Sequence, residues 1–137
     1  MKCLLAFFLF VLFPRIGYGQ AVNTNTEQQI KNTLVSGGYS GQTDKQLSRI
    51  GDAAAVIVTK VLGESNLAPQ DIENILIVIH LSFSAPHLVE APEDRNPRAT
   101  LFLLRSLNSV TTDEKLRQRI SEERKFVLGQ FENPKNN

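Results

Sequence analysis

The sequence predicts an all-α protein of about five helices, and three observations lead to this class. Apolar residues recur at steps of three and four, which is the spacing of one helix face. Capping residues and prolines stand where those apolar stretches begin. No hairpin signal and no β-α-β alternation occurs along the chain. The architecture is therefore either a short α-solenoid-like array of helix pairs or a small helical bundle.

The first 20 residues are typical of a secretory signal peptide. Lys2 gives a positive start, residues 4–13 form a ten-residue apolar run, and the small residues Gly17 and Gly19 follow. A membrane anchor is the alternative, but a helix needs about 20 apolar residues to cross a bilayer. We expect cleavage near Gly19 or Ala21, a periplasmic or secreted mature chain, and membrane contact only before cleavage.

Cysteine content and charge narrow the class of the mature chain. The only cysteine of the sequence, Cys3, lies in the predicted signal peptide. The mature chain therefore has no cysteine, and no disulfide is expected. The remaining chain of roughly 117 residues is long enough to bury one core without disulfides. Without Lys2 and Arg15, the 15 basic residues fall to 13 against 14 acidic ones, a net charge of −1. Nucleic-acid-binding proteins carry a clustered basic excess, so we predict no nucleic-acid partner.

Residues 21–42 are predicted as a polar leader with one short helix and a linker. The helix starts near Thr26 and carries Ile30 and Leu34 on one face. The stretch SGGYSGQ (36–42) is glycine-rich and is predicted to be a flexible connector. It has neither the spacing of a phosphate-binding loop nor that of a serine-hydrolase elbow.

A helical domain is predicted over residues 43–131, with a polar tail over 132–137. Its first helix spans about 43–62 and is capped by Thr43 or Asp44. Gly51-Asp52 in the middle is either a kink or the start of a shorter helix. The apolar face of this segment is Leu47, Ile50, Ala54, Ile57, Val58, Val61 and Leu62.

The next helix is predicted over residues 69–83. Pro69 suits a first helical turn, and the acidic Asp71 suits the positive end of a helix dipole. The β-branched run ILIVI (75–79) also fits a strand, but the capped start and the length favour a helix. Apolar residues cover nearly all of its faces, which is typical of a helix buried between neighbours.

An acidic, proline-containing connector over 84–96 precedes the last two helices. Asn96-Pro97 predicts the N-cap and first turn of a helix that ends near Asn108. Thr111 with Glu114 predicts a capping box for the final helix. We expect an ion pair between Asp113 and Arg117 on that helix. Its apolar stripe is predicted to be Leu116, Ile120, Val127 and Phe131.

Two helix pairs recur, over 51–83 and 96–128, at an offset of 45 residues. The sequence IGDAA (50–54) opens the first pair, and Asn-Pro (96–97) opens the second. On these residues the chain resembles HEAT and armadillo helical repeats over about residues 49–128, since such repeats recur every 40–47 residues or so. The sequence departs from them in lacking a Val-Arg pair after the proline. The resemblance implies a scaffold that binds proteins, with no catalytic residues.

The two histidines lie in the stretch HLSFSAPHLVE (80–90). A metal site there would use His87, Glu90, Glu93 and Asp94, with His80 reaching over. A proline separates the histidines, and the chain has neither a His-x-x-x-His pair nor a thiolate in this region. We therefore predict no metal and no cofactor.

A nucleophile with its base would pair His80 with Ser82 or Ser84. No neighbouring acid in the sequence orients that imidazole, so no catalytic residue is predicted. We expect His80 to be a half-buried core residue and His87 a surface loop residue. A metal-dependent or hydrolytic enzyme that uses both histidines and nearby carboxylates is the alternative.

The function predicted from the sequence is that of a non-enzymatic protein-interaction module, as an adaptor, inhibitor or immunity protein. Its partner is expected to be a protein, and self-association is left open. The connector is the predicted binding segment. The residues expected to contact the partner are His87, Glu90, Glu93, Asp94 and Arg95.

Overall fold

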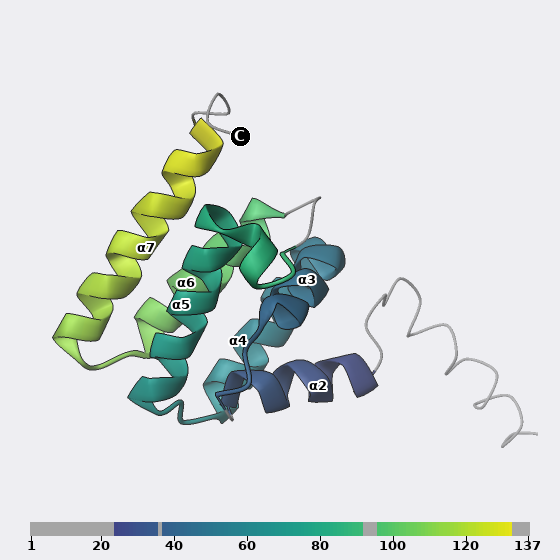
Figure 1. Cartoon of the computed structure of the whole chain (residues 1–137). Coiled ribbons are helices and arrows are strands. Elements are labelled where there is room, and N and C mark those ends of the chain that lie inside the picture. Colours follow the sequence, from purple (N-terminus) through teal and green to yellow (C-terminus); the bar gives the residue numbers. More distant parts are fainter. Residues whose placement is uncertain (1–23, 36, 92–95, 133–137) are drawn as a thin grey trace, which may run out of the picture.

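The computed structural model describes residues 24–35, 37–91 and 96–132. The helices, labelled as in Figure 1, are α2 (Thr24–Val35), α3 (Gly41–Ile50), α4 (Ala54–Glu64), α5 (Pro69–Ser84), α6 (Pro97–Val110) and α7 (Glu114–Glu132). Two 3-10 turns, Gly51–Ala53 and Pro86–Leu88, complete the elements. No strand occurs in these ranges, so the all-α class is confirmed.

The helix α2 buries the two residues expected on its inner face, Ile30 and Leu34. The segment after it differs from the flexible connector predicted over 36–42. Tyr39 is only 3 % exposed. The side-chain amide of Asn74 on α5 donates to the carbonyl oxygens of Gly37 and Tyr39, at 3.0 Å each. These bonds hold the backbone of the segment against α5, because they satisfy carbonyl groups that a loop would otherwise leave to water.

The segment predicted as helical over 43–62, with a kink or the start of a shorter helix at Gly51-Asp52, is two helices. α3 ends at Ile50 and α4 begins at Ala54, with a 3-10 turn between them. Gly51 has a φ of 65°, a backbone conformation that glycine adopts without the steric cost that a Cβ brings. The chain therefore changes direction at Gly51, and both helices can turn their apolar faces to one core.

The segment 69–83 is a helix, so the strand alternative for ILIVI is wrong. Pro69 occupies the first turn of α5, and the Asp71 carboxylate accepts a hydrogen bond of 3.2 Å from the backbone N–H of Ala68. This cap, together with burial on several faces, outweighs the β-branched composition. The buried residues of α5 are Ile72, Ile75, Leu76, Val78, Ile79 and Ser82.

At the start of α6 the predicted cap is confirmed, because the Asn96 side chain accepts from the backbone N–H of Arg98 at 3.0 Å. At the start of α7 the predicted capping box is wrong. The Thr111 hydroxyl donates to the Leu107 carbonyl at 2.6 Å and so belongs to the end of α6. Asp113 caps α7 instead, accepting from the backbone N–H of Leu116 at 2.9 Å.

The ion pair expected between Asp113 and Arg117 is also wrong. Arg117 lies 3.9 Å from the Glu114 carboxylate, one turn along α7. The Asp113 carboxylate already accepts the capping bond, which turns it toward the helix terminus. Three residues of the expected stripe of α7, Leu116, Ile120 and Val127, are buried, whereas Phe131 is exposed.

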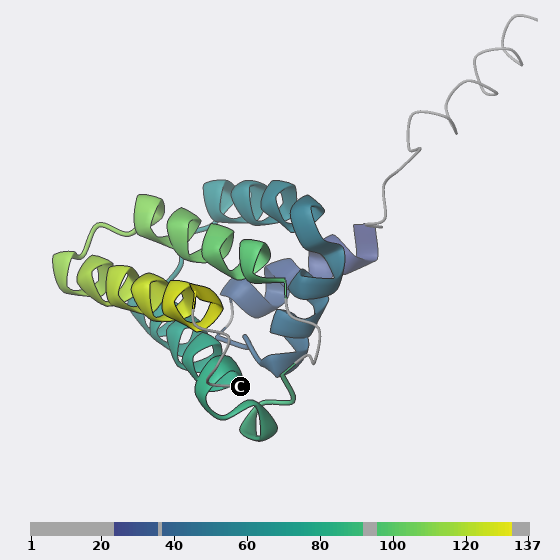
Figure 2. The same ribbon diagram turned by 90° about the horizontal axis from the view of Figure 1, so that it is seen from above.

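The helices form a small bundle around one apolar core. α6 packs against α4 on one side and α7 on the other, while α5 packs against α7 and α3 (Figure 2). Side chains of α5 meet those of α7 in the order Glu73 with Arg119, His80 with Glu123, and Phe83 with Phe131. The residue numbers rise together along both helices. α5 and α7 are therefore parallel neighbours (Figure 1).

The predicted signal peptide, over residues 1–20, lies outside the described part of the chain, as do residues 133–137 of the predicted tail. Among the described helices, none has the length and hydropathy needed to cross a bilayer.

Candidate functional site

The predicted binding connector is described only in part. Glu93, Asp94 and Arg95 lie outside the described residues. His87 is exposed in the 3-10 turn Pro86–Leu88, as expected for a surface residue. Of the five predicted contact residues, the structure therefore describes two, His87 and Glu90.

The described part of the connector rests on the first turn of α3. The Glu90 carboxylate accepts a hydrogen bond of 2.6 Å from the side-chain amide of Gln42. A Cβ added to Gly41 would overlap the carbonyl oxygen of Val89, so the two backbones approach too closely for any other residue at position 41. Glu90 thus holds the connector on the bundle, a role that sequence reasoning did not anticipate.

His80 and His87 do not form a joint site. His80 faces α7, whereas His87 lies beyond the end of α5 and contributes nothing to the hollow around His80. Among the described residues, no three His, Cys, Asp or Glu side chains are grouped so that they could hold a metal ion. Pro86 explains the separation, because it ends the helix on which a seven-residue spacing would share a face.

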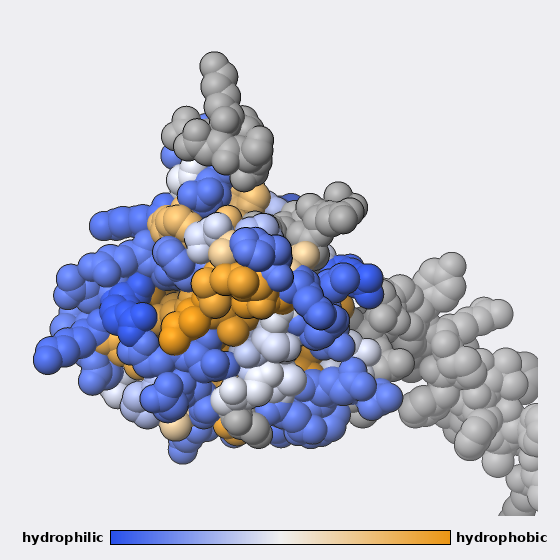
Figure 3. Space-filling model, viewed as in Figure 1, coloured by the Kyte–Doolittle hydropathy of each residue, from blue (hydrophilic) through white to orange (hydrophobic). Residues whose placement is uncertain are grey.

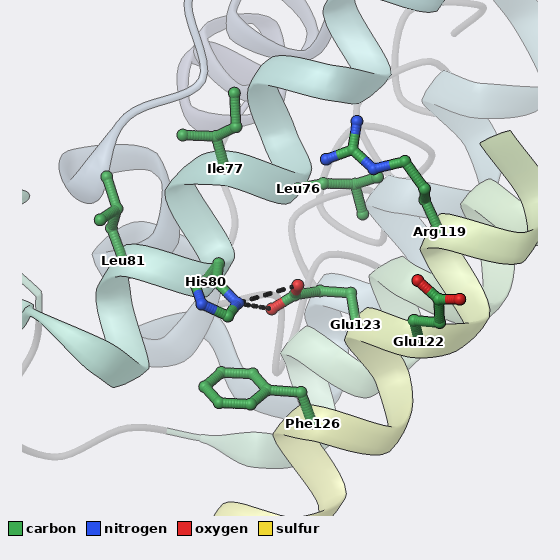
Figure 4. Close-up of a pocket in the computed structure, with 8 residues that line it drawn as sticks. All are labelled: Leu76, Ile77, His80, Leu81, Arg119, Glu122, Glu123 and Phe126. Carbon is green, nitrogen blue, oxygen red and sulfur yellow. Dashed lines mark hydrogen bonds and ion pairs between the residues drawn. The ribbon is translucent and has the colours of Figure 1, made fainter.

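His80 is held by two residues of α7. Its Nδ1 atom lies 3.2 Å and 3.1 Å from the two carboxylate oxygens of Glu123. Its ring stacks on Phe126, with ring centroids 4.4 Å apart and planes inclined by 28°. The side chain keeps 48 % of its surface exposed, so it is a surface residue at a helix interface more than a core residue. In Figure 4 the second ring nitrogen points away from Glu123.

A groove with a volume of about 480 Å³ lies between α5 and α7 around this pair, within the size range of ligand pockets (Figure 4). Its apolar wall comes from α5 and its charged wall from α7. The lining residues are Leu76, Ile77, His80, Leu81, Arg119, Glu122, Glu123 and Phe126. Ile77 is 49 % exposed.

The space-filling view shows a hydrophobic area over the middle of α5, bordered by hydrophilic side chains on the α7 side (Figure 3). Ile77 is the large apolar side chain of α5 that is exposed. Exposed apolar side chains scattered singly are ordinary on a folded protein, whereas a contiguous area rimmed by polar groups marks an interaction surface.

The charges of the groove are mostly acidic. Arg119 forms an ion pair with Glu73 on α5, so its charge is already balanced. Burial raises the pKa of the Glu123 carboxyl, and the neighbouring His80 and Arg119 act in the opposite direction. Glu122 is exposed and accepts a hydrogen bond of 3.1 Å from Gln118. The lining of the groove therefore presents one exposed carboxylate, that of Glu122, and no cation that is not already paired.

The serines near His80 bond to the backbone and not to the imidazole ring. The Ser82 hydroxyl donates to the Val78 carbonyl and the Ser84 hydroxyl donates to the His80 carbonyl, each at 2.8 Å. Both hydroxyls therefore bond to the backbone of their own helix. The fold does place an acid beside His80, because Glu123 lies 43 residues away along the chain but faces the imidazole.

Sequence reasoning missed every α7 residue of this site. Arg119, Glu123 and Phe126 are spaced four and three residues apart, so they share one face of a helix. That face lies beside the apolar stripe of α7 and carries two charged side chains and one aromatic side chain in successive turns. The spacing signals a contact with a neighbouring helix, although it does not say which one.

The chain was compared with protein-family models, with curated proteins and with solved structures, and no significant match was found. The resemblance to HEAT and armadillo repeats therefore stays a prediction.

Proposed function

We propose that the chain is an exported, non-enzymatic helical-repeat protein that acts as a protein-interaction module, of adaptor, inhibitor or immunity type. The export proposal rests on the N-terminal sequence, with its apolar run over 4–13 and the small residues Gly17 and Gly19. The repeat proposal rests on the sequence alone, in which two helix pairs recur over 51–83 and 96–128.

The observation that carries the binding proposal is the apolar groove between α5 and α7. Its wall exposes Ile77 in the middle of α5, and Leu81 and the ring of Phe126 also line the groove. Burying the exposed half of such a side chain in an interface contributes about 1 kcal/mol. We therefore assign partner binding to this groove first, and to His87 and Leu88 of the connector second.

A matched pair of substitutions tests the assignment. Ile77→Ser changes the groove, and Val56→Ser changes an exposed β-branched residue on α4, outside it. The full chain carries a tag after Asn137 and is expressed in its source organism, and bound proteins are captured and identified. The proposal expects a partner that Val56→Ser retains and Ile77→Ser loses. A partner retained equally by both variants would move the binding site elsewhere.

A hydrolytic function is the second candidate, favoured by one observation. The Nδ1 atom of His80 faces the Glu123 carboxylate, which is how a carboxylate orients an imidazole base. Hydrolysis of activated esters by the purified chain would support it, provided that His80→Asn abolishes the activity and His87→Asn leaves it unchanged. Equal rates in both variants and the wild type would exclude this role for His80.

A further inference from the structure

The groove between α5 and α7 is shaped for a helix. It runs between two parallel helices and is lined by their side chains. Ridges and grooves on paired helices accept a third helix, whose side chains recur at the same three- and four-residue spacing. A peptide that binds by adding a strand would instead need a sheet edge, and the described residues contain no strand to provide one.

The charges that line the groove determine which charged residues a bound helix would carry. Glu122 lines the α7 wall with an exposed carboxylate. Glu123 is already engaged by His80, and Arg119 is balanced by Glu73. Other cations of α7, such as Arg124, do not line the groove. An occupant with lysine or arginine beside its apolar stripe would meet the Glu122 carboxylate, whereas an acidic occupant would meet a like charge.

From these two features we propose that the occupant of the α5–α7 groove is a basic amphipathic helix of a partner protein. Its apolar face packs on Ile77, Leu81 and Phe126, and its cation lies against Glu122. This inference rests on the proposed function, because it names the class of partner for the same site.

Two designed peptides of about 18 residues, long enough to form helices, test the inference. The first has leucines at helical spacing with lysines on the flank of the stripe, and the second replaces each lysine by glutamate. Binding is measured by the fluorescence anisotropy of the labelled peptides and by amide shifts of the ¹⁵N-labelled chain. We expect the lysine peptide to bind about tenfold more tightly, with shifts concentrated on α5 and α7.

Charge reversal at Glu122 tests whether the preference for a basic peptide comes from this carboxylate. Glu122→Lys is expected to weaken the lysine peptide about tenfold and to strengthen the glutamate peptide. Glu64→Lys makes the same change of net charge on α4, outside the groove, and should leave both affinities within twofold of the wild type. An equal response to the two reversals would mean that net charge, and no local contact, governs binding, and would overturn the inference.

The remaining outcomes separate this inference from the function on which it rests. The inference fails if the lysine peptide does not bind or if both peptides bind equally. It also fails if sedimentation finds a dimer that Ile77→Ser dissociates, because a second copy would then occupy the groove. The proposed function survives these failures if a captured partner still depends on Ile77. If the captured partner did not depend on Ile77, the proposed binding function of the groove would be rejected as well.

Discussion

The imidazole of His80 lies against the ring of Phe126, with centroids 4.4 Å apart, and joins the middle of α5 to the second half of α7. An aromatic pair of this kind contributes about 0.5–1.5 kcal/mol beyond the area that it buries. The same imidazole faces Glu123, one turn before Phe126 on α7. One side chain therefore makes two different contacts between the helices, and substitutions can separate them.

His80→Ala should lower the free energy of unfolding by roughly 1 kcal/mol, because it removes the stacking on Phe126. His80→Phe should restore most of this loss, since a phenyl ring stacks without pairing with Glu123. Urea denaturation followed by circular dichroism measures both. His87→Ala is the control and should be neutral, since His87 is exposed in a 3-10 turn. Equal losses in the two histidine variants would contradict the assigned contact.

The pH dependence of stability should change when Glu123 is replaced by glutamine. Burial raises the pKa of the Glu123 carboxyl in the folded chain, with His80 and Arg119 acting against it. Its contribution to stability is therefore fully present below the unfolded-state pKa of about 4.5 and is lost as pH rises through the folded-state pKa. Glu123→Gln titrates in neither state. The difference in free energy of unfolding between Glu123→Gln and the wild type should therefore rise, in favour of the variant, from about pH 4 toward neutrality.

Urea denaturation at several pH values between about 4 and 7 measures this difference. Glu122→Gln, which removes an exposed carboxylate on the same turn of α7, is the control. A relative stability of Glu123→Gln that falls with rising pH would mean that His80 and Arg119 outweigh the burial of the carboxyl.

Gly41→Ala should destabilise the chain by about 1–3 kcal/mol, because the new methyl group would overlap the Val89 carbonyl oxygen. Gly63→Ala on α4 is the matched control. A Cβ at position 63 meets no atom within 4 Å, and alanine in a helix is favoured over glycine by about 0.5–1 kcal/mol. Thermal unfolding should move in opposite directions for the two variants. A neutral Gly41→Ala would show that the connector is not held against α3.

Asn74→Ala should cost about 1–3 kcal/mol, since it removes two hydrogen bonds to the carbonyl oxygens of Gly37 and Tyr39. Asn74→Asp should cost more, because a carboxylate cannot donate and would repel both carbonyls. Denaturant unfolding gives the values, with Asn66→Ala in an exposed loop as the neutral control. Unchanged hydrogen exchange of the backbone amides of residues 37–40 in Asn74→Asp would show that the two Asn74 hydrogen bonds do not hold this segment against α5.

Local signals in the sequence predicted the helices well where a cap and a periodic stripe occur together. Asn96-Pro97 opens α6, and the buried residues Leu116, Ile120 and Val127 follow the stripe expected on α7. The capping box at Thr111 was wrong because two capping residues lie within three positions, Thr111 and Asp113. Sequence spacing alone does not say which of them ends one helix and which begins the next.

The groove could not be predicted in the same way. His80 and Glu123 are 43 residues apart, and only the packing of α5 on α7 brings them together. Tyr39 was likewise placed in a linker, because one aromatic residue among glycines gives no periodic signal. Its backbone carbonyl is bound by Asn74, 35 residues further along the chain. Long-range partners of this kind are set by the arrangement of helices, which local propensity does not determine.

The parallel course of α5 and α7 gives the groove a direction. Both helix dipoles point the same way, from the Arg119 end of the groove toward its Phe126 end. A helix in the groove therefore runs either with both walls or against both, and its dipole opposes both walls only when it runs antiparallel to them. The site therefore distinguishes the two ends of its occupant, as well as its two faces.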